Sequence, residues 1–318
     1  MPRTSKPKKP KAKTLSLYEI MQKFPDEQSA IDYLAGIFWK DGVFCPHCKS
    51  KNVKERKNRK NYHHCNACGK DFTIRTGTIF ARSHIPLHKW LMAIYLLVTE
   101  RKGVSSVQLS VQLWIKQQSA WFLAMRIRKA CENQKNKILS GIVEVDEGYF
   151  GGLEKNKHEN KKLNAGRGTV GKTAVLGMRS RDGQTVAKVV EKTDAATLQG
   201  EIKQNVLKGS IVCTDENNPY NGLATDFDHQ RVNHSAKQYV CGIASTNSVE
   251  SYWAIMKRGH YGVYHRFSKK HLQRYADEFA FRLGDGKVDN DTTVRMDALL
   301  LGAVGKRLTY KMLKKGVQ

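Results

Sequence analysis

Two closely spaced cysteine pairs constrain the fold of this chain more than any other feature. Cys45-Pro-His-Cys48 and Cys65-Asn-Ala-Cys68 are separated by sixteen residues. Each Cys-x-x-Cys knuckle can supply two thiolates to one tetrahedral Zn²⁺, and the spacing falls within the range of zinc ribbons. A redox dithiol is the alternative, but the motif is doubled and lacks thioredoxin-like surroundings. We therefore predict a structural zinc ribbon in which all four cysteines bind Zn²⁺.

The charge of the chain limits the class of partner. Its 318 residues include 55 Lys and Arg against 29 Asp and Glu, a formal net charge of +26. Such a surplus favours a polyanion, of which nucleic acid is the natural candidate. The cations are spread along the chain rather than gathered on one amphipathic helix, which argues against an anionic membrane. No apolar run approaches a membrane span and the first residues lack a signal peptide, so we expect a cytoplasmic protein.

Changes in composition and periodicity divide the chain into five parts. Three prolines and six Lys or Arg among the first thirteen residues predict a disordered basic arm. The five predicted parts are this arm (1–13), an N-terminal helix plus the zinc ribbon (14–83), a helical region (84–138), an α/β domain (139–285) and a C-terminal tail or helix (286–318).

The helical region carries a possible DNA-binding motif. Stretches 105–113 and 117–129 have helical character and are joined by a short turn, which predicts a helix-turn-helix. The second stretch ends in Arg126, Arg128 and Lys129, which we expect to contact DNA. A plain helical bundle is the alternative interpretation of this region.

Two aspartates end short apolar stretches in the α/β domain. Asp146 closes the predicted strand 142–146, and Asp215 follows the predicted strand 210–214. Open α/β sheets place their ligands at the carboxyl ends of strands, so neighbouring strands would bring both acids to one edge. Glu144 and Glu147 flank Asp146, and we expect them to point to the opposite face of the strand.

A third group of polar residues occurs at helical spacing. Asn247, Glu250, Lys257 and Arg258 would lie along roughly one side of a helix. A solvent-facing amphipathic helix is one interpretation. Beside the two aspartates, the helix could instead supply a third ligand to divalent ions held about 4 Å apart, as in phosphoryl transfer. Lys257 and Arg258 would then contact DNA phosphates.

Several segments resemble one protein family. The sequences CPHC, CNAC, RTGTIF, VEVDEGYFGG, TDENNPY and TNSVESYWAIMKRGHYGVYH are similar to those of IS1595-group insertion-sequence transposases with an ISXO2-like catalytic domain. The resemblance covers about residues 20 to 285. It implies an RNase H-like fold and DDE-type transposition. The reaction would be metal-dependent cleavage and strand transfer of double-stranded DNA, at the terminal inverted repeats of the element and at a target.

The resemblance also implies roles for individual residues. Asp146 and Asp215 match the first two acids of the family, and Lys257 matches its lysine. The third position is either Asn247, as the family pattern indicates, or Glu250, which as a carboxylate is the better ligand for Mg²⁺ or Mn²⁺. Catalytic and metal-binding roles are therefore assigned to Asp146, Asp215, Asn247 and Glu250 together. His234 could assist proton transfer or be structural.

We thus predict an α+β multidomain chain, with an N-terminal zinc ribbon and a helix-turn-helix-like region before an RNase H-like α/β catalytic domain. The expected protein is a prokaryotic transposase that acts as a homo-oligomer in a synaptic complex with DNA. Three alternatives stay open: a zinc-ribbon regulator that only binds DNA, a catalytically inactive relative, and a nuclease that cuts without joining.

Overall fold

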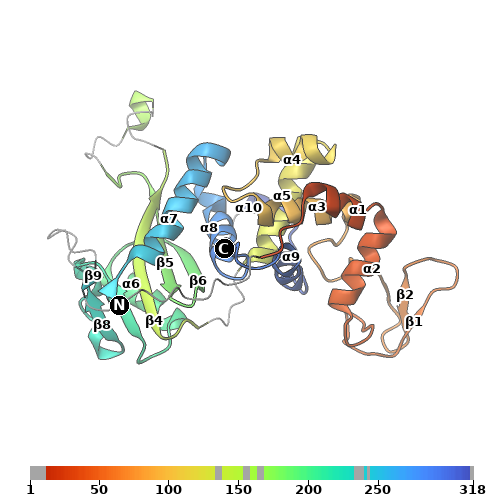
Figure 1. Cartoon of the computed structure of the whole chain (residues 1–318), viewed down its shortest axis with the longest axis horizontal. Coiled ribbons are helices and arrows are strands. Elements are labelled where there is room, and N and C mark those ends of the chain that lie inside the picture. Colours follow the sequence, from red (N-terminus) through yellow and green to blue (C-terminus); the bar gives the residue numbers. More distant parts are fainter. Residues whose placement is uncertain are drawn as a thin grey trace, which may run out of the picture.

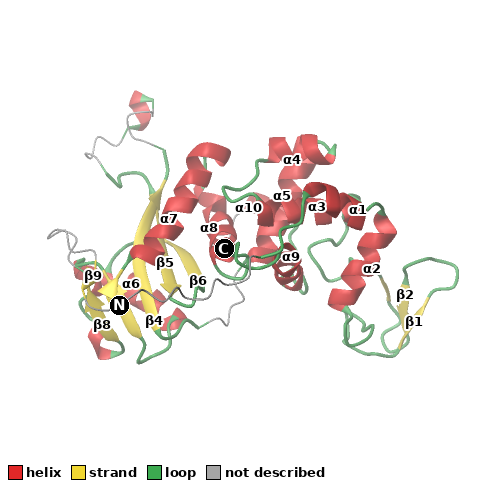
Figure 2. Ribbon diagram, in the orientation of Figure 1, coloured by secondary structure: helices red, strands yellow, loops and turns green. Residues whose placement is uncertain are grey.

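The chain is elongated, with a small ribbon at one end and a five-stranded sheet at the other (Figure 1). The computed structural model describes residues 12–132, 138–152, 158–162, 168–232, 240–241 and 244–315. The predicted basic arm lies almost entirely outside these residues. Helices fill the space between the two ends (Figure 2).

The ribbon end consists of two helices and a small antiparallel sheet. Its elements are α1 (Leu17–Lys23), α2 (Glu27–Phe38), β1 (Val53–Glu55), β2 (His63–Cys65) and β3 (Asp71–Phe72), with the strands in the order β1-β2-β3. Asp26 caps α2, because its Oδ1 accepts the backbone N–H of Ser29 at 2.8 Å. The capped helix packs against the helices that follow the ribbon.

A helical body follows the ribbon, and the C-terminal part of the chain completes it. Its helices are α3 (Leu87–Thr99), α4 (Ser106–Leu113), α5 (Gln117–Cys131) and α9 (Thr292–Leu301). Trp90 and Leu91 of α3 share one buried core with Leu299 and Leu300 of α9. Segment 286–318 was predicted as a separate tail or helix, but α9 is an integral part of this core.

The stretches predicted as two helices form α4 and α5, but the basic end of α5 is buried. Arg126 is 4% exposed and donates to a backbone carbonyl at 2.7 Å. Arg128 is 2% exposed, and its Nε donates to Glu278 Oε2 of α8 (Leu272–Leu283) at 2.5 Å. The prediction that Arg126 and Arg128 contact DNA is therefore wrong, because both guanidinium groups are held in the interior. Lys129 is half-buried and remains a predicted contact.

The second half of the chain forms the main sheet. Its strands are β4 (Ile142–Phe150), β5 (Thr173–Ser180), β6 (Thr185–Val190), β7 (Ile211–Thr214) and β8 (Asp228–Arg231), in the order β6-β5-β4-β7-β8. β4, β5 and β6 are antiparallel neighbours, whereas β7 and β8 run parallel to β4. This mixed sheet has the RNase H-like arrangement that was expected.

Helices cover both faces of the sheet. On one face, α6 (Ala195–Asn205) packs through Leu198 and Ile202 against Val143 and Val145 of β4. On the other, α7 (Asn247–Gly259) and α8 (Leu272–Leu283) share a core with β5 and β6. The alternation along β4 therefore sends its odd-numbered valines toward α6 and its even-numbered residues toward α7.

Strand β4 is longer than predicted. It continues to Phe150, so Asp146 is its fifth residue rather than its last, and Gly148 does not end it. The other described elements are β9 (Val240–Cys241), β10 (Ala244–Ser245), α10 (Tyr310–Lys315), a π-helical turn (His260–Tyr264) and 3₁₀ turns at Glu159–Lys161, Asn218–Tyr220, Leu223–Thr225 and Lys269–His271.

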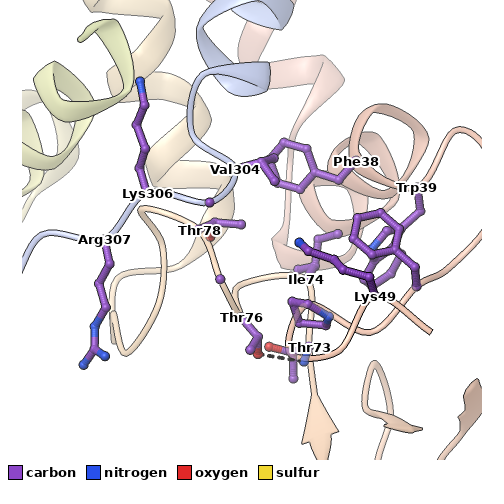
Figure 3. A pocket seen from close by; sticks show the side chains of 14 residues that line it. Phe38, Trp39, Lys49, Thr73, Ile74, Thr76, Thr78, Val304, Lys306 and Arg307 are labelled. Carbon is purple, nitrogen blue, oxygen red and sulfur yellow. Dashed lines mark hydrogen bonds between the residues drawn. The ribbon is translucent and has the colours of Figure 1, made fainter. Parts of the chain in front are cut away.

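The ribbon end is joined to the C-terminal segment by backbone pairing. Gly305 N–H donates to the Gly77 carbonyl at 2.8 Å, and Thr78 pairs with Val304. Beside this junction lies a cavity of about 210 Å³ whose apolar end is formed by the ring of Trp39 and its neighbours (Figure 3). The side chain of Lys306 points away from that end, toward carbonyls at the end of α5. The cavity is thus a feature of the junction between the ribbon end and the C-terminal segment.

Within the described part of the chain, no helix has the length and apolar character needed to cross a membrane.

Candidate active site and zinc centre

The four cysteines of the ribbon converge on one point. Their sulfur atoms all lie within 4.8 Å of one another. Cys45 Sγ is 3.7 Å from Cys68 Sγ, and Cys48 Sγ is 3.5 Å from Cys65 Sγ. A tetrahedral Zn²⁺ with Zn–S bonds of about 2.3 Å requires sulfur separations of about 3.8 Å. The observed set therefore fits Zn²⁺.

The two knuckles have the same backbone geometry. Lys49 N–H donates to the Cys45 carbonyl at 2.8 Å, and Gly69 N–H donates to the Cys65 carbonyl at the same distance. Lys49 and Gly69 both adopt left-handed conformations, with φ of 65° and 68°. Nearby His64 lies instead against Asp71, with Nδ1 2.7 Å from Oδ1. The closed four-thiolate site needs no histidine.

Asp146 and Asp215 lie on neighbouring parallel strands. In the parallel pairing of β4 with β7, each residue lies beside the one 69 positions later, from Ile142 beside Ile211 to Glu144 beside Cys213. Extending this register by two residues brings Asp146 beside Asp215. Asp215 directly follows the last residue of β7. Asp146 lies in the middle of β4, but it is level with the end of β7, the strand that runs parallel to β4. Both carboxylates therefore belong to one edge of the fold, as predicted from the two strands.

The electrostatics of Asp146 indicate that Glu250 lies close by as well. Burial raises the pKa of Asp146 to about 6, and the negative charges of Asp215 and Glu250 add to the rise. Such mutual repulsion is relieved when a cation binds between the acids. Among the described residues, only the ribbon cysteines bring three or more ligand atoms within 4.8 Å of each other. The ligand oxygens of Asp146, Asp215 and Glu250 therefore do not all lie within 4.8 Å of one another.

Trp253 joins α7 to Asp146. Its Nε1–H donates to Asp146 Oδ2 at 2.9 Å. The indole lies on two glycines of the sheet, because a Cβ built on either Gly148 or Gly177 would come within 2.6 Å of the ring. Gly148, predicted to allow the chain to leave the strand, instead makes room for this indole.

Glu144 holds the beginning of α7. It is 1% exposed, and its Oε2 accepts the backbone N–H groups of Ser248 at 2.7 Å and Val249 at 3.2 Å. Ser245 Oγ donates to its other oxygen at 3.0 Å. A carboxylate here satisfies N–H groups that lack partners within the helix and opposes the helix dipole. The prediction that Glu144 points away from Asp146 is wrong, because residues two apart in a strand share a face.

The polar residues of α7 divide between two flanks of the helix. At 3.6 residues per turn, Lys257 lies about 20° from Glu250 around the helix axis. Asn247 and Arg258 lie on the other side of Glu250, at about 60° and about 80° from it. Glu250 is exposed, and its Oε1 accepts a hydrogen bond from Thr246 Oγ1 at 3.1 Å. Lys257 thus shares the side of Glu250, whereas Arg258 turns toward the outer flank. Asn247 is exposed at the first position of the helix.

Glu147 points to the other face of β4, as predicted. Its carboxylate contacts the loop that follows Asp215. Tyr220 Oη donates to its carboxylate, and burial raises the pKa of Glu147 to about 7. Asn217 in the same loop donates its backbone N–H to Asp215 Oδ1 at 3.1 Å. The sequence did not predict the hydrogen bonds made by Glu144, Glu147 and Trp253. The two-residue period of β4 could have placed Glu144 on the same face as Asp146. His234 lies outside the described residues.

We predict that Gly177→Ala destabilises the fold by about 1–3 kcal/mol, because its methyl group would displace the Trp253 indole from the sheet. Gly200→Ala is the matched control: nothing lies within 4 Å of its Cβ position in α6, and we expect it to stabilise the helix by up to about 1 kcal/mol. Urea unfolding measures both changes. Equal effects of the two substitutions would contradict the packing described for Trp253.

We also predict one Zn²⁺ per chain, lost from Cys48→Ser because three thiolates no longer close the site. Elemental analysis of purified protein measures the zinc content. Cys131→Ala is the control, since this buried thiol lies in the helical body. A full zinc content in the Cys48→Ser variant would refute the assignment.

Comparison with known proteins finds two matching family models, one relative and one solved structure. Residues 138–284 match the family model of the ISXO2-like transposase domain, and residues 25–71 match the transposase zinc-ribbon domain. A protein in transposable element ISH50 of Halobacterium salinarum, itself uncharacterized, is 28% identical over 278 residues, covering 81% of this chain and 91% of its own length. A pre-cleavage Mos1 transpososome structure aligns with 66% of this chain and 78% of its own, at 15% identity and a TM-score of 0.27. Two stretches of the chain are therefore similar to the zinc-ribbon and ISXO2-like transposase domains of the IS1595 group.

Proposed function

We propose that this chain is a DDE-type transposase that cleaves DNA at the terminal inverted repeats of an insertion sequence and joins the ends to a target. The observation that carries the proposal is the placement of Asp146 beside Asp215, with the charge of Glu250 acting on Asp146. Three acids from two strands and one helix, on a strongly basic chain, suit a metal-dependent reaction of a polyanion.

The residues that would bind Mg²⁺ or Mn²⁺ are Asp146, Asp215 and either Glu250 or Asn247. Carboxylate and amide oxygens are the ligands that these hard cations prefer. When bound, the ions supply an activated water or hydroxyl and stabilise the leaving oxygen of the phosphodiester. Glu250 fits the third position through its charge near Asp146, and Asn247 fits it through the family pattern.

The remaining groups of the site position these ligands. Trp253 orients one oxygen of the Asp146 carboxylate. Glu144 fixes the start of α7, and so sets the height of Asn247 and Glu250 above the sheet. Lys257, on the side of Glu250, is suited to hold a phosphate of the reacting strand.

The zinc ribbon and the helical body would bind the element ends. The loop between the two knuckles exposes six cations, namely Lys49, Lys51, Lys54, Lys57, Arg59 and Lys60. Phosphate contacts from such a loop add affinity and orientation. Lys129 is a further candidate contact, and assembly of two element ends would require a homo-oligomer.

The test is strand transfer of a labelled duplex carrying the inverted repeat that flanks the coding gene, with Mg²⁺ or Mn²⁺. We expect Asp146→Ala and Asp215→Ala to reduce joining by at least about 10³-fold, because each removes a metal ligand. Of Asn247→Ala and Glu250→Ala, the more severe loss identifies the third ligand.

Two results would overturn the proposal. Undiminished joining by the Asp146→Ala variant would exclude these acids from the reaction. Binding of the repeat by the wild type without any cleavage would favour a DNA-binding regulator or an inactive relative, and cleavage without joining would favour a nuclease.

A further inference from the structure

A basic cleft lies between the helical body and the catalytic domain, beside the end of α7. Its volume is about 580 Å³. The lining includes two carboxylates, Asp182 and Asp289, and six cations: Arg101, Lys102, Arg179, Arg258, Arg282 and Lys287. These cations come from α3, β5, α7 and α8 and from the loops beside them, so folding gathers them from four distant parts of the sequence.

The cleft is separate from the carboxylate site but shares α7 with it. Arg258 and Ile255 line the cleft, eight and five residues after Glu250. Helical geometry places them about 80° and 140° around the axis from Glu250, and Arg258 about 12 Å farther along it. A DNA segment crossing the outer surface of α7 could therefore contact Arg258 while another part reaches the acids.

Three of these cations have no compensating charge. Arg101, Lys102 and Arg258 are exposed, and none of them forms an ion pair in the described part of the chain. Arg282 differs, because its Nη2 lies 2.6 Å from Glu278 Oε1 in the interior. Arg179 donates to Thr185 Oγ1 at 2.9 Å at the sheet end of the cleft. The uncompensated cations face one hollow, where their repulsion would be relieved by an anion.

Close backbone contacts fix the walls of the cleft. Gly259, at the end of α7, lies against the Lys102 carbonyl so closely that a Cβ there would be 2.8 Å from the oxygen. Arg282 Nη1 donates to the Glu100 carbonyl at 2.7 Å from the opposite side. The cleft is thus formed before any ligand binds, which reduces the cost of ordering it on binding.

We propose that this cleft binds the phosphodiester backbone of duplex DNA, through Arg101, Lys102 and Arg258. Repeated phosphates match cations spaced along a groove, and Val98 and Ile255 add an apolar wall against which deoxyribose can pack. The proposal rests on the proposed function for its partner, but it concerns binding rather than chemistry. The two probes of the experiment below distinguish the two sources of such a duplex, which are an element end and any other DNA, including the target.

The test measures DNA affinity of the full chain by fluorescence anisotropy over a series of salt concentrations, without added divalent cation. The double variant Arg101→Ala/Arg258→Ala is compared with Lys192→Ala, which removes an exposed cation beyond the other end of β6. One probe is a duplex with the inverted repeat, and the other is a random duplex of equal length.

We expect the double variant to bind at least about tenfold more weakly and to lower the slope of log K against log salt by about 1.8, since each lost phosphate contact removes about 0.9. Lys192→Ala should match the wild type. A loss with both probes assigns the cleft to any duplex, and a loss with the repeat alone assigns it to the element end. Unchanged affinity and slope with both probes would overturn the proposal. Because the assay needs no catalysis, it stands apart from the Asp146→Ala result.

Discussion

The candidate active site depends on the buried carboxylate of Glu144, which accepts the first free N–H groups of α7. Removing an anion from water is costly unless hydrogen bonds compensate it. Here Ser248, Val249 and Ser245 supply them, and the helix dipole adds a favourable field. The helix is consequently fixed to the middle of β4, two residues before Asp146. Asn247 and Glu250 owe their position to a residue that is not itself a candidate ligand.

Packing then sets how closely the helix approaches the sheet. Gly148 on β4 and Gly177 on β5 leave a flat area in which the Trp253 indole can lie. The indole N–H reaches Asp146 from this position and orients its carboxylate. Burial and the charges of two neighbouring acids raise the pKa of Asp146, whereas the hydrogen bond from Trp253 lowers it. The repulsion between these acids costs stability, as is common where a fold prepares charged groups for a ligand.

Local patterns in the sequence were sufficient for the zinc ribbon and for the two aspartates. The cysteine spacing specifies its own ligand set, and the apolar runs before Asp146 and Asp215 predict the two strands, although Asp146 lies inside β4 rather than at its end. Long-range contacts were not accessible in this way. Arg128 is a surface cation by its local pattern, yet its partner Glu278 lies 150 residues later and buries it. The packing of α9 into the helical body has the same origin, since nothing near Leu299 indicates that its neighbours come from α3.

Glu144, through α7, would position the residues that we propose to bind divalent cations. The most direct measurement is Mn²⁺ affinity of Glu144→Gln, followed by the relaxation of water protons, with folding checked by circular dichroism. A residue that orients ligands typically changes metal affinity by about 10–100-fold when it is replaced, and we expect a weakening in that range. Lys192→Ala should bind Mn²⁺ as the wild type does. Unchanged Mn²⁺ affinity in a folded Glu144→Gln variant would contradict the positioning role of Glu144.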